Sequence, residues 1–172
     1  MKMKSIKHIL AVAALGSSLT VAANASAADW NYVGGGFYDF GDTGFYLEGS
    51  TFIADRLVLN AEIGDTYDTV FRGGVSFLTD LSLGQAPVFV SGGYSDYSFD
   101  DGIYFGAGVT LALDEGVNTK FELLHDTAGD GFMRFRSGVT FAISDKLNLA
   151  GSYSLNNRSF SNELRLGVQY KF

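Results

Sequence analysis

The charged residues that could do chemistry in this chain stand at alternate positions inside stretches that are otherwise apolar or small. Four are acidic and five are basic: Glu48, Glu62, Glu122, Glu163, Arg72, Lys120, Arg134, Arg136 and Arg165. Alternation places such residues on one face of a strand, so we expect them to share one interior. Unpaired buried charges are costly and arginine binds carboxylates through parallel hydrogen bonds, so a charge-paired network is predicted. Such a network either fills and stiffens the interior or forms a narrow path for ions.

A second group of carboxylates is concentrated in short polar segments between the apolar stretches. It comprises Asp42, Asp65, Asp68, Asp96, Asp100, Asp101, Asp126 and Asp130. Carboxylate oxygens suit Ca²⁺ or Mg²⁺, so these residues on one rim could bind divalent cations loosely. Aspartate is also the ordinary residue of tight turns, and the sequence lacks an EF-hand type of calcium loop. Solvated turns are therefore the favoured interpretation, with no specific metal site and no cofactor.

A repeated G-x-x-Φ element, in which Φ is a bulky apolar or aromatic residue, organises the chain. Its five copies occupy 49–52, 74–77, 108–111, 138–141 and 167–170. Each of the first four is followed by a short polar turn and a new alternating run. Each copy therefore indicates the lower half of a descending strand, and each following run the next ascending strand. With an opening strand added, the predicted strands are 30–40, 45–54, 56–64, 69–78, 87–95, 102–113, 118–126, 132–143, 147–155 and 160–172.

Apolar and polar positions alternate with a period of two in these strands, most clearly in 132–143 and 160–172. Apolar-out and polar-in alternation over segments of about ten residues is typical of a transmembrane β-barrel. A soluble sandwich also alternates, but its outward face would be polar. We therefore predict an all-β, antiparallel up-and-down barrel. Tight turns at 54–56, 114–116 and 144–146 favour ten strands, with eight as the alternative.

The first 27 residues have the pattern of a cleaved export signal. Lys2, Lys4 and Lys7 precede a short apolar stretch from Ile9 to Leu15, and residues 25–27 form an A-x-A cleavage site. The apolar stretch is too short to span a bilayer, which takes about 20 apolar residues. Removal of residues 1–27 leaves one expected domain, the barrel, over residues 28–172.

Composition narrows the function further. The chain carries 19 acidic and 12 basic residues, and three of the basic ones lie in the export signal, so no nucleic-acid partner is expected. It has no cysteine, which excludes disulfides and thiolate metal sites.

Aromatic belts are expected at the two membrane interfaces. One would hold Trp30, Tyr32, Phe52, Phe77, Phe141, Tyr170 and Phe172, and the other Tyr38, Phe40, Phe45, Phe71, Tyr94, Phe105 and Phe135.

The end of the chain resembles the signal that the Gram-negative barrel-assembly machinery reads. The matching positions are a polar Arg165, Gly167, an aromatic Tyr170 and the final Phe172. In pattern and size, residues 28–172 resemble small outer-membrane barrels typified by OmpX, NspA and the transmembrane domain of OmpA. The resemblance implies a monomer with a polar, hydrogen-bonded interior and often no wide pore. It also implies outer-membrane lipids, lipopolysaccharide and the assembly machinery as partners.

The function predicted from these patterns is a non-enzymatic, structural outer-membrane barrel with a mostly plugged lumen and both termini in the periplasm. The alternative is a narrow porin-like channel for ions or small solutes. A third hypothesis is a surface enzyme centred on His125, which lies beside Asp126 at the expected outer end of a strand. No serine is spaced two residues from His125 and no motif supplies a second acid, so we predict no enzymatic activity.

Overall fold

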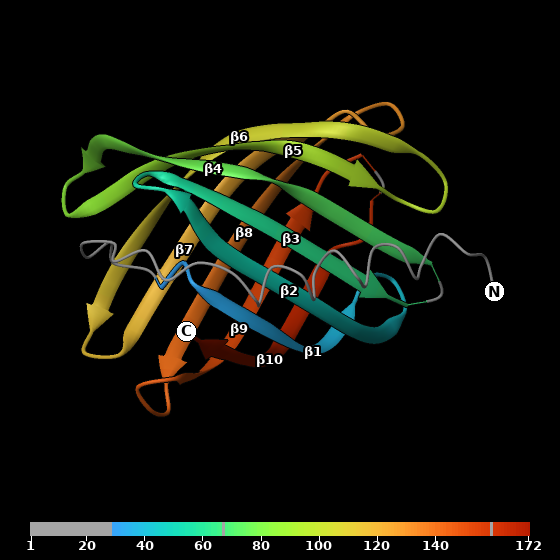
Figure 1. Cartoon of the computed structure of the whole chain (residues 1–172). Coiled ribbons are helices and arrows are strands. Elements are labelled where there is room, and N and C mark those ends of the chain that lie inside the picture. Colours follow the sequence, from blue (N-terminus) through green and yellow to red (C-terminus); the bar gives the residue numbers. More distant parts are fainter. Residues whose placement is uncertain (1–28, 67, 159) are drawn as a thin grey trace.

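The chain forms a closed antiparallel barrel of ten strands in the computed structural model, which describes residues 29–66, 68–158 and 160–172 (Figure 1). The strands are β1 (Tyr32–Asp39), β2 (Thr43–Ala54), β3 (Leu57–Asp65), β4 (Thr69–Leu83), β5 (Ala86–Asp96), β6 (Asp101–Asp114), β7 (Val117–Asp126), β8 (Phe132–Ala142), β9 (Leu147–Asn156) and β10 (Glu163–Lys171). Strands adjacent in sequence pair with each other, and β1 also pairs with β10, from Tyr32 opposite Lys171 to Asp39 opposite Leu164. Closure removes the free sheet edges, which a barrel in lipid requires.

The predicted fold class and the strand count of ten are confirmed, and the eight-strand alternative is wrong. The largest difference in bounds is at β4, which continues past the predicted end at residue 78 to Leu83. Its register shifts between Leu78 and Ser82, after which it pairs again with the start of β5. The predicted export signal over 1–27 lies outside the described residues. Within the described part of the chain, no helix is long and apolar enough to cross a membrane.

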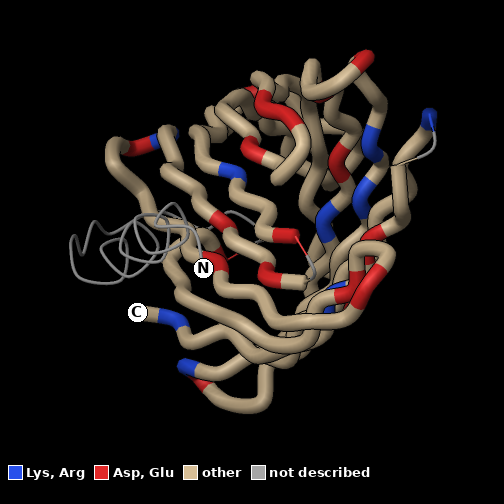
Figure 2. The backbone as a smooth tube through the Cα atoms, turned by 90° about the vertical axis from the view of Figure 1, so that its right-hand side faces the viewer, with Lys and Arg blue, Asp and Glu red and all other residues tan. Residues whose placement is uncertain are grey.

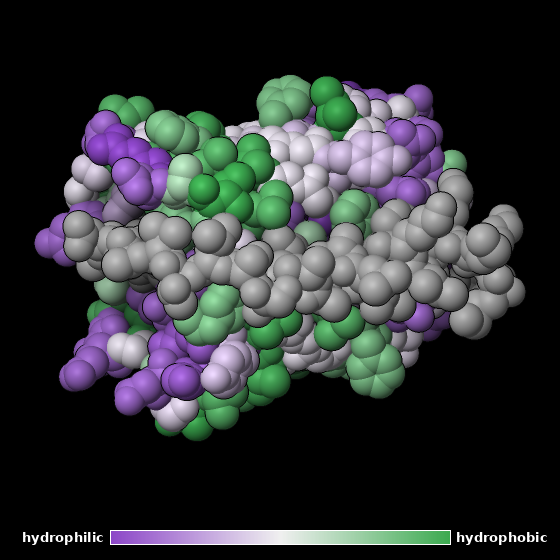
Figure 3. Space-filling model, in the orientation of Figure 1, coloured by the Kyte–Doolittle hydropathy of each residue, from purple (hydrophilic) through white to green (hydrophobic). Residues whose placement is uncertain are grey.

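Side chains alternate between the lumen and the outer surface of the barrel. On β10, Leu164, Leu166 and Val168 are exposed, whereas Glu163 and Arg165 are buried. Figure 3 shows one flank of the molecule, where hydrophobic side chains are spread over the middle and hydrophilic ones gather toward both ends. An apolar exterior around a polar interior is the arrangement that the period-two pattern predicts.

The expected aromatic belts are only partly present on the outer surface. Exposed as predicted are Phe45, Phe77, Tyr94, Phe105, Phe135, Phe141, Tyr170 and Phe172. Trp30, Tyr32, Tyr38, Phe40 and Phe52 were assigned to the belts wrongly, because their side chains face the interior of the barrel. They occupy even-numbered positions in or next to β1 and β2, and Glu48 on β2 shows that this parity faces the lumen.

Some glycines of the repeat are required by close packing between strands. A Cβ on Gly167 would lie 2.3 Å from the Gly35 carbonyl oxygen, and one on Gly74 would lie 2.3 Å from the Gly92 carbonyl oxygen. At Gly138 the nearest atom would be 3.5 Å away, an ordinary contact. At Gly74 and Gly167 the neighbouring strands therefore leave no room for a side chain, so glycine is required there. At Gly138, the equivalent position on β8, a side chain would fit.

The two ends of the barrel differ in what closes them. Both ends of the described chain meet at one end, where Asp29 pairs with Lys171 at 3.1 Å and the Phe172 amide donates to the Asn31 carbonyl. We call this the terminal end. The loops that follow β1, β3, β5, β7 and β9 form the opposite end, which we call the distal end. The C-terminus is marked at the terminal end in Figure 1.

Candidate functional site: the lumen

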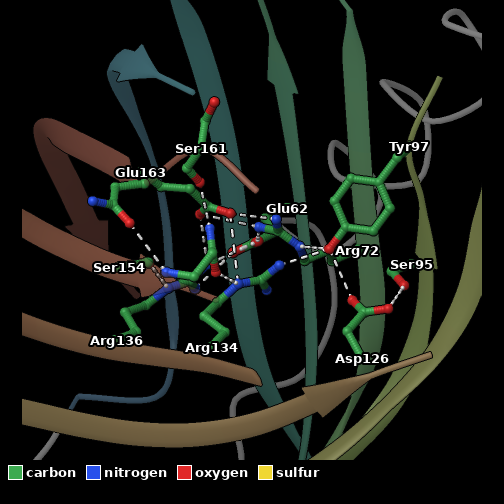
Figure 4. A network of polar contacts seen from close by, with 12 residues as sticks. Glu62, Arg72, Ser95, Tyr97, Asp126, Arg134, Arg136, Ser154, Ser161 and Glu163 are labelled. Atoms are coloured by element: carbon green, nitrogen blue, oxygen red, sulfur yellow. Dashed lines mark hydrogen bonds and ion pairs between the residues drawn. The ribbon is translucent and has the colours of Figure 1, made fainter. Parts of the chain in front are cut away.

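Two carboxylates and four arginines fill the lumen toward the distal end (Figure 4). Glu62 on β3 accepts hydrogen bonds from Arg72 at 2.6 Å and from both terminal nitrogens of Arg165 at 2.6 and 2.9 Å. Arg136 donates to the same carboxylate at 3.1 and 3.3 Å. Glu62 is thus surrounded by three guanidinium groups from β4, β8 and β10. Such forked contacts fix the orientation of both partners.

Glu163 is the second shared carboxylate, and its side chain is fully buried. Arg165 donates to its Oε2 at 3.1 Å and Arg136 at 3.3 Å, while Arg72 binds both oxygens. Arg134 lies 3.5 Å from Oε1. The four arginines therefore bind to two acids, and every one of these six residues projects inward from the barrel wall. Register explains part of the arrangement, since Arg72 stands directly opposite Glu62 on the neighbouring strand.

A tyrosine hydroxyl connects this group to a further carboxylate. The Tyr97 hydroxyl accepts from Arg134 at 2.6 Å and from Arg72 at 3.2 Å, and it donates to Asp126 at 2.8 Å. Ser95 donates to the other oxygen of Asp126 at 2.9 Å. Figure 4 shows the Tyr97 hydroxyl between the arginines and Asp126. The placement of Asp126 on a solvated rim was therefore wrong: β7 ends with this side chain turned inward and fully buried.

Asp126 completes the charge balance of the interior. Among the described residues, the lumen holds five basic side chains and five acidic ones: Arg72, Lys120, Arg134, Arg136, Arg165, Glu48, Glu62, Glu122, Asp126 and Glu163. In Figure 2, a row of basic segments runs along the strands at the right, while acidic segments lie on other strands and on the turns. Buried ions are tolerated when they are paired and hydrogen-bonded, so a balanced set is the physically expected one.

An aromatic cluster closes the lumen at the distal end. Phe132 on β8 stacks on Phe160 with ring centroids 3.9 Å apart, and Tyr97 meets Phe132 edge-on at 5.9 Å. Phe40, from the loop after β1, and Phe99, from the same loop as Tyr97, pack against Tyr97. Phe132 is 1% exposed and Tyr97 is 2% exposed. These rings therefore lie across the distal end of the lumen next to the arginine network, and a rim cavity of about 330 Å³ borders Phe40, Tyr97 and Phe99.

The terminal half of the lumen is less tightly filled. Here Gln169 donates to Glu48 at 2.8 Å, and Lys120 pairs with Glu122 at 3.1 Å. The Lys120 ammonium also lies 4.6 Å from the centre of the Trp30 ring. A cavity of about 110 Å³ borders these groups, and a second of about 70 Å³ lies between Tyr32, Tyr104 and the arginine network.

Three of the remaining rim aspartates accept hydrogen bonds from groups at the distal end. Asp42 accepts from the Thr43 amide at 2.8 Å, Asp65 from the Thr69 hydroxyl at 3.3 Å, and Asp100 from the Gly129 amide at 2.7 Å. Among the described residues, no three His, Cys, Asp or Glu side chains lie close enough together to hold a metal ion. Asp68, Asp96, Asp101 and Asp130 also lie at the distal rim, and loose cation binding there stays a prediction.

His125 lies on the outward face of β7, away from the lumen network. Its ring packs edge-on against Phe105, with centroids 5.3 Å apart, and Phe105 stands directly opposite it on β6. The neighbouring Leu123 shares its face and is exposed, whereas Leu124 and Asp126 on either side of His125 are buried. The imidazole and Asp126 therefore point to opposite sides of the barrel wall, which removes the acid partner that the sequence suggested.

The residues of the predicted assembly signal divide between the two faces of β10. Arg165 points into the lumen, Gly167 packs against Gly35 and Tyr46, and Tyr170 and Phe172 are exposed. Recognition by an assembly machinery stays a prediction.

Three residues that line the interior were not among the site residues predicted from the sequence: Tyr97, Asn148 and Gln169. Tyr97 stands two positions after the inward-facing Ser95, so the period-two pattern could have placed it inside the barrel.

Comparisons with known proteins agree with the barrel fold. No family model matches the chain, and no curated protein matches it. A solved structure described as "KdgM porin in complex with disordered oligogalacturonate" is similar, with a TM-score of 0.56 and 10% identity over 82% of this chain and 99% of that one. A second, described as "KdgM porin", has a TM-score of 0.54, also at 10% identity over 82% of this chain and 99% of its own. At this identity the likeness concerns the fold.

Proposed function

We propose that this chain is a non-enzymatic outer-membrane barrel of the porin type, a narrow conduit for ions or small solutes that rests in a closed state. The terminal end would face the periplasm and the distal end the outside. The exposed apolar wall and the charge-lined interior support the location. The similarity to solved porins supports the channel in preference to a purely structural role.

The observation that carries the proposal is that side chains close the lumen. The occluding groups are rings from the wall and the short distal loops, together with arginines of the wall. Side chains can rearrange without breaking the backbone ladder of the barrel, because they take no part in the hydrogen bonds between strands. Below the rings, one cavity occupies the terminal half and a smaller one borders the arginine network. Opening would therefore require local movement around Tyr97 and Phe160 and a change of partners among the arginines.

Single-channel recording of the refolded chain in a planar bilayer tests this proposal. We expect brief openings of the unaltered protein and longer ones in Tyr97→Ala, which removes both a ring of the closure and the hydroxyl that binds Arg134. Substitution of Arg136, which lines both cavities, should change the ion preference of any current. A folded Tyr97→Ala protein that never conducts would contradict the proposal.

The completeness of the ion pairing supports one other candidate, the structural barrel with a permanently plugged lumen. Every carboxylate of the network near the distal end has at least two hydrogen-bond donors. A network so fully bonded is stiff, because moving one member leaves others unpaired. This candidate gives silent bilayers for the unaltered chain and for Tyr97→Ala alike.

The proposal also covers how the barrel is assembled and which lipids surround it. The run from Arg165 to Phe172 would be read by the barrel-assembly machinery, and the rim would lie among lipopolysaccharide headgroups in a monomeric barrel. The exposed aromatic rings of Tyr170 and Phe172 at the terminal end support recognition from the periplasmic side. Removal of Phe172 should lower the amount of folded protein in outer membranes, whereas Phe172→Tyr, which keeps an aromatic ring at the end of β10, should leave it unchanged.

A further inference from the structure

The terminal-half cavity has a lining that the proposed conduit does not by itself explain. It is bordered by the aromatic side chains of Trp30, Tyr32 and Tyr46 and by the amides of Asn118, Asn148 and Gln169. Aromatic rings offer flat apolar surface, and amides offer both a donor and an acceptor. A concave site with mostly apolar walls and a few convergent polar groups is the usual form of a small-molecule site.

Two residues that line this cavity each carry a buried polar atom without a protein partner. Among the described residues, the Asn148 Oδ1 acceptor and the Arg165 Nε donor are buried without a hydrogen bond. Asn148 is 3% exposed and Arg165 is 4% exposed, and both residues line the cavity from adjacent strands, β9 and β10. Buried polar groups are almost always satisfied, so an unpaired acceptor and an unpaired donor on two residues that line one cavity point to a ligand with hydroxyl groups that completes their hydrogen bonding once the side chains shift.

The charges around the cavity argue for a neutral ligand. Lys120 is paired with Glu122 at 3.1 Å, and the terminal nitrogens of Arg165 are bound to Glu62. Glu48 accepts from Gln169, and Asp29 at the cavity mouth pairs with Lys171. An ionic ligand would have to compete with these pairs, whereas a hydroxyl both donates and accepts without disturbing them.

We propose that the terminal-half cavity binds a small neutral polyhydroxylated solute, a polyol or a monosaccharide. The Asn148 amide oxygen would accept from one hydroxyl and Arg165 Nε would donate to another, while the C–H faces of the solute pack on the rings. This deepens the proposed function by naming the solute class of the conduit, and it rests on that function for its biological meaning. Binding itself does not require conduction.

The chain carries its own reporter for the test. It has one tryptophan, Trp30, which lies at the cavity. Refolded protein in detergent is titrated with erythritol and glucose as neutral probes, and with glucuronate and glucosamine as charged ones, while Trp30 fluorescence is recorded. We expect a saturable change with at least one neutral probe and, at the same concentrations, none with either charged probe. Titration calorimetry repeats the measurement without depending on the position of Trp30.

A matched pair of variants localises the binding. Asn148→Ala should weaken binding about 3- to 10-fold, the effect of one lost hydrogen bond. Ser91→Ala, which alters a lumen hydroxyl away from this cavity, should leave binding unchanged. Folding is checked by heat-modifiable migration in gels. If Asn148→Ala does not fold, Asn148→Gln, which keeps an amide but displaces it, takes its place.

The outcomes separate this inference from the proposed function. Saturable binding of a neutral probe in a protein that never conducts supports the binding site and overturns the conduit. A protein that conducts but shows no saturable signal with erythritol or glucose, by fluorescence or by calorimetry, overturns the binding site. Equal binding of glucose and glucuronate also overturns it, because the ion pairs would then exert no selection.

Discussion

The distal and terminal halves of the lumen are built from the same residue types in different ways. In the distal half, Arg134, Asp126 and Glu163 are at most 1% exposed and share partners with one another. In the terminal half, Lys120 pairs with Glu122 and its side chain is 33% exposed, while Glu48 accepts from Gln169 and reaches the distal network only through Arg165 at 4.0 Å. The distal half is an interlocked network beneath a layer of rings, with a cavity of about 330 Å³ on the rim side of those rings. The terminal half keeps a cavity of about 110 Å³ beside its charges, and a smaller one of about 70 Å³ borders the arginine network.

This difference shows how one interior can combine closure with a site for solutes. Shared carboxylates make the distal network cooperative, because the loss of one acid leaves several arginines without a partner. Separate pairs in the terminal half can change one at a time. Stability should therefore depend on the distal half, and selectivity on the terminal half.

Loss of a charge from each half gives the largest contrast. Glu163→Gln leaves four buried arginines around a neutral side chain and should lower the free energy of unfolding by about 3 to 5 kcal/mol. Glu48→Gln gives up one long contact of 4.0 Å with Arg165 and keeps an acceptor for Gln169, so it should lower the free energy of unfolding by about 1 kcal/mol. Urea unfolding of both proteins in detergent measures the difference. Equal losses would show that the two halves are energetically alike.

Truncation of a fully buried ring in each half separates stability from closure. Phe132→Ala and Phe89→Ala both remove a lumen ring that is 1% exposed, so each should destabilise by about 3 kcal/mol. Phe132 belongs to the distal closure, whereas Phe89 packs against Trp30 in the terminal half. We expect longer bilayer openings in Phe132→Ala alone. Matching openings in Phe89→Ala would place the closure elsewhere.

Removal of a single hydroxyl tests the bridge between Arg134 and Asp126. Tyr97→Phe keeps the ring and removes the bridging oxygen, which should cost about 1 to 3 kcal/mol because two buried charged groups lose a partner. Tyr38→Phe is the control, since the buried Tyr38 hydroxyl has no partner among the described residues. That change should be neutral or slightly stabilising in the same urea titration. A reversed order would exclude the hydroxyl bridge.

The smallest effect on stability is expected from Lys120. Lys120→Gln breaks a partly exposed pair with Glu122 and should change the free energy of unfolding by less than about 1 kcal/mol. It leaves the lumen with one more acid than base, so any current should shift toward cations. Reversal potentials in a salt gradient measure that shift. A large loss of stability with unchanged selectivity would mean that Lys120 belongs to the rigid half.

The strand pattern and the lumen parity were predictable because the side-chain period of a strand is two residues. All nine charged residues assigned to the interior from parity do line it in the structure. Asp126 was assigned to the rim because it stands at a strand end, where sequence cannot tell the last inward position from the first turn residue. Trp30, Tyr32, Tyr38, Phe40 and Phe52 were placed outside because their aromatic type was weighed above parity.

The distal closure could not be predicted for a different reason. Phe40, Tyr97 and Phe160 lie in three loops that are far apart in the sequence, and they meet because the strands that carry them converge around one axis. Loop length and barrel twist determine whether these rings come into contact, and neither produces a periodic pattern in the sequence. The cavity at Asn148 is likewise a property of packing between strands, so the residue types alone did not reveal it.

Thiol accessibility tests most directly whether a buried, interlocked closure lies above an open terminal half. The chain has no cysteine, so Ser152→Cys, at the terminal-half cavity, and Ser95→Cys, beside Asp126, each place one thiol in one half of the lumen. Each folded protein is treated with a charged, membrane-impermeant thiol reagent. We expect rapid modification at position 152 and at least tenfold slower modification at position 95, where the side chain is fully buried. Equal rates at the two positions would contradict the closure.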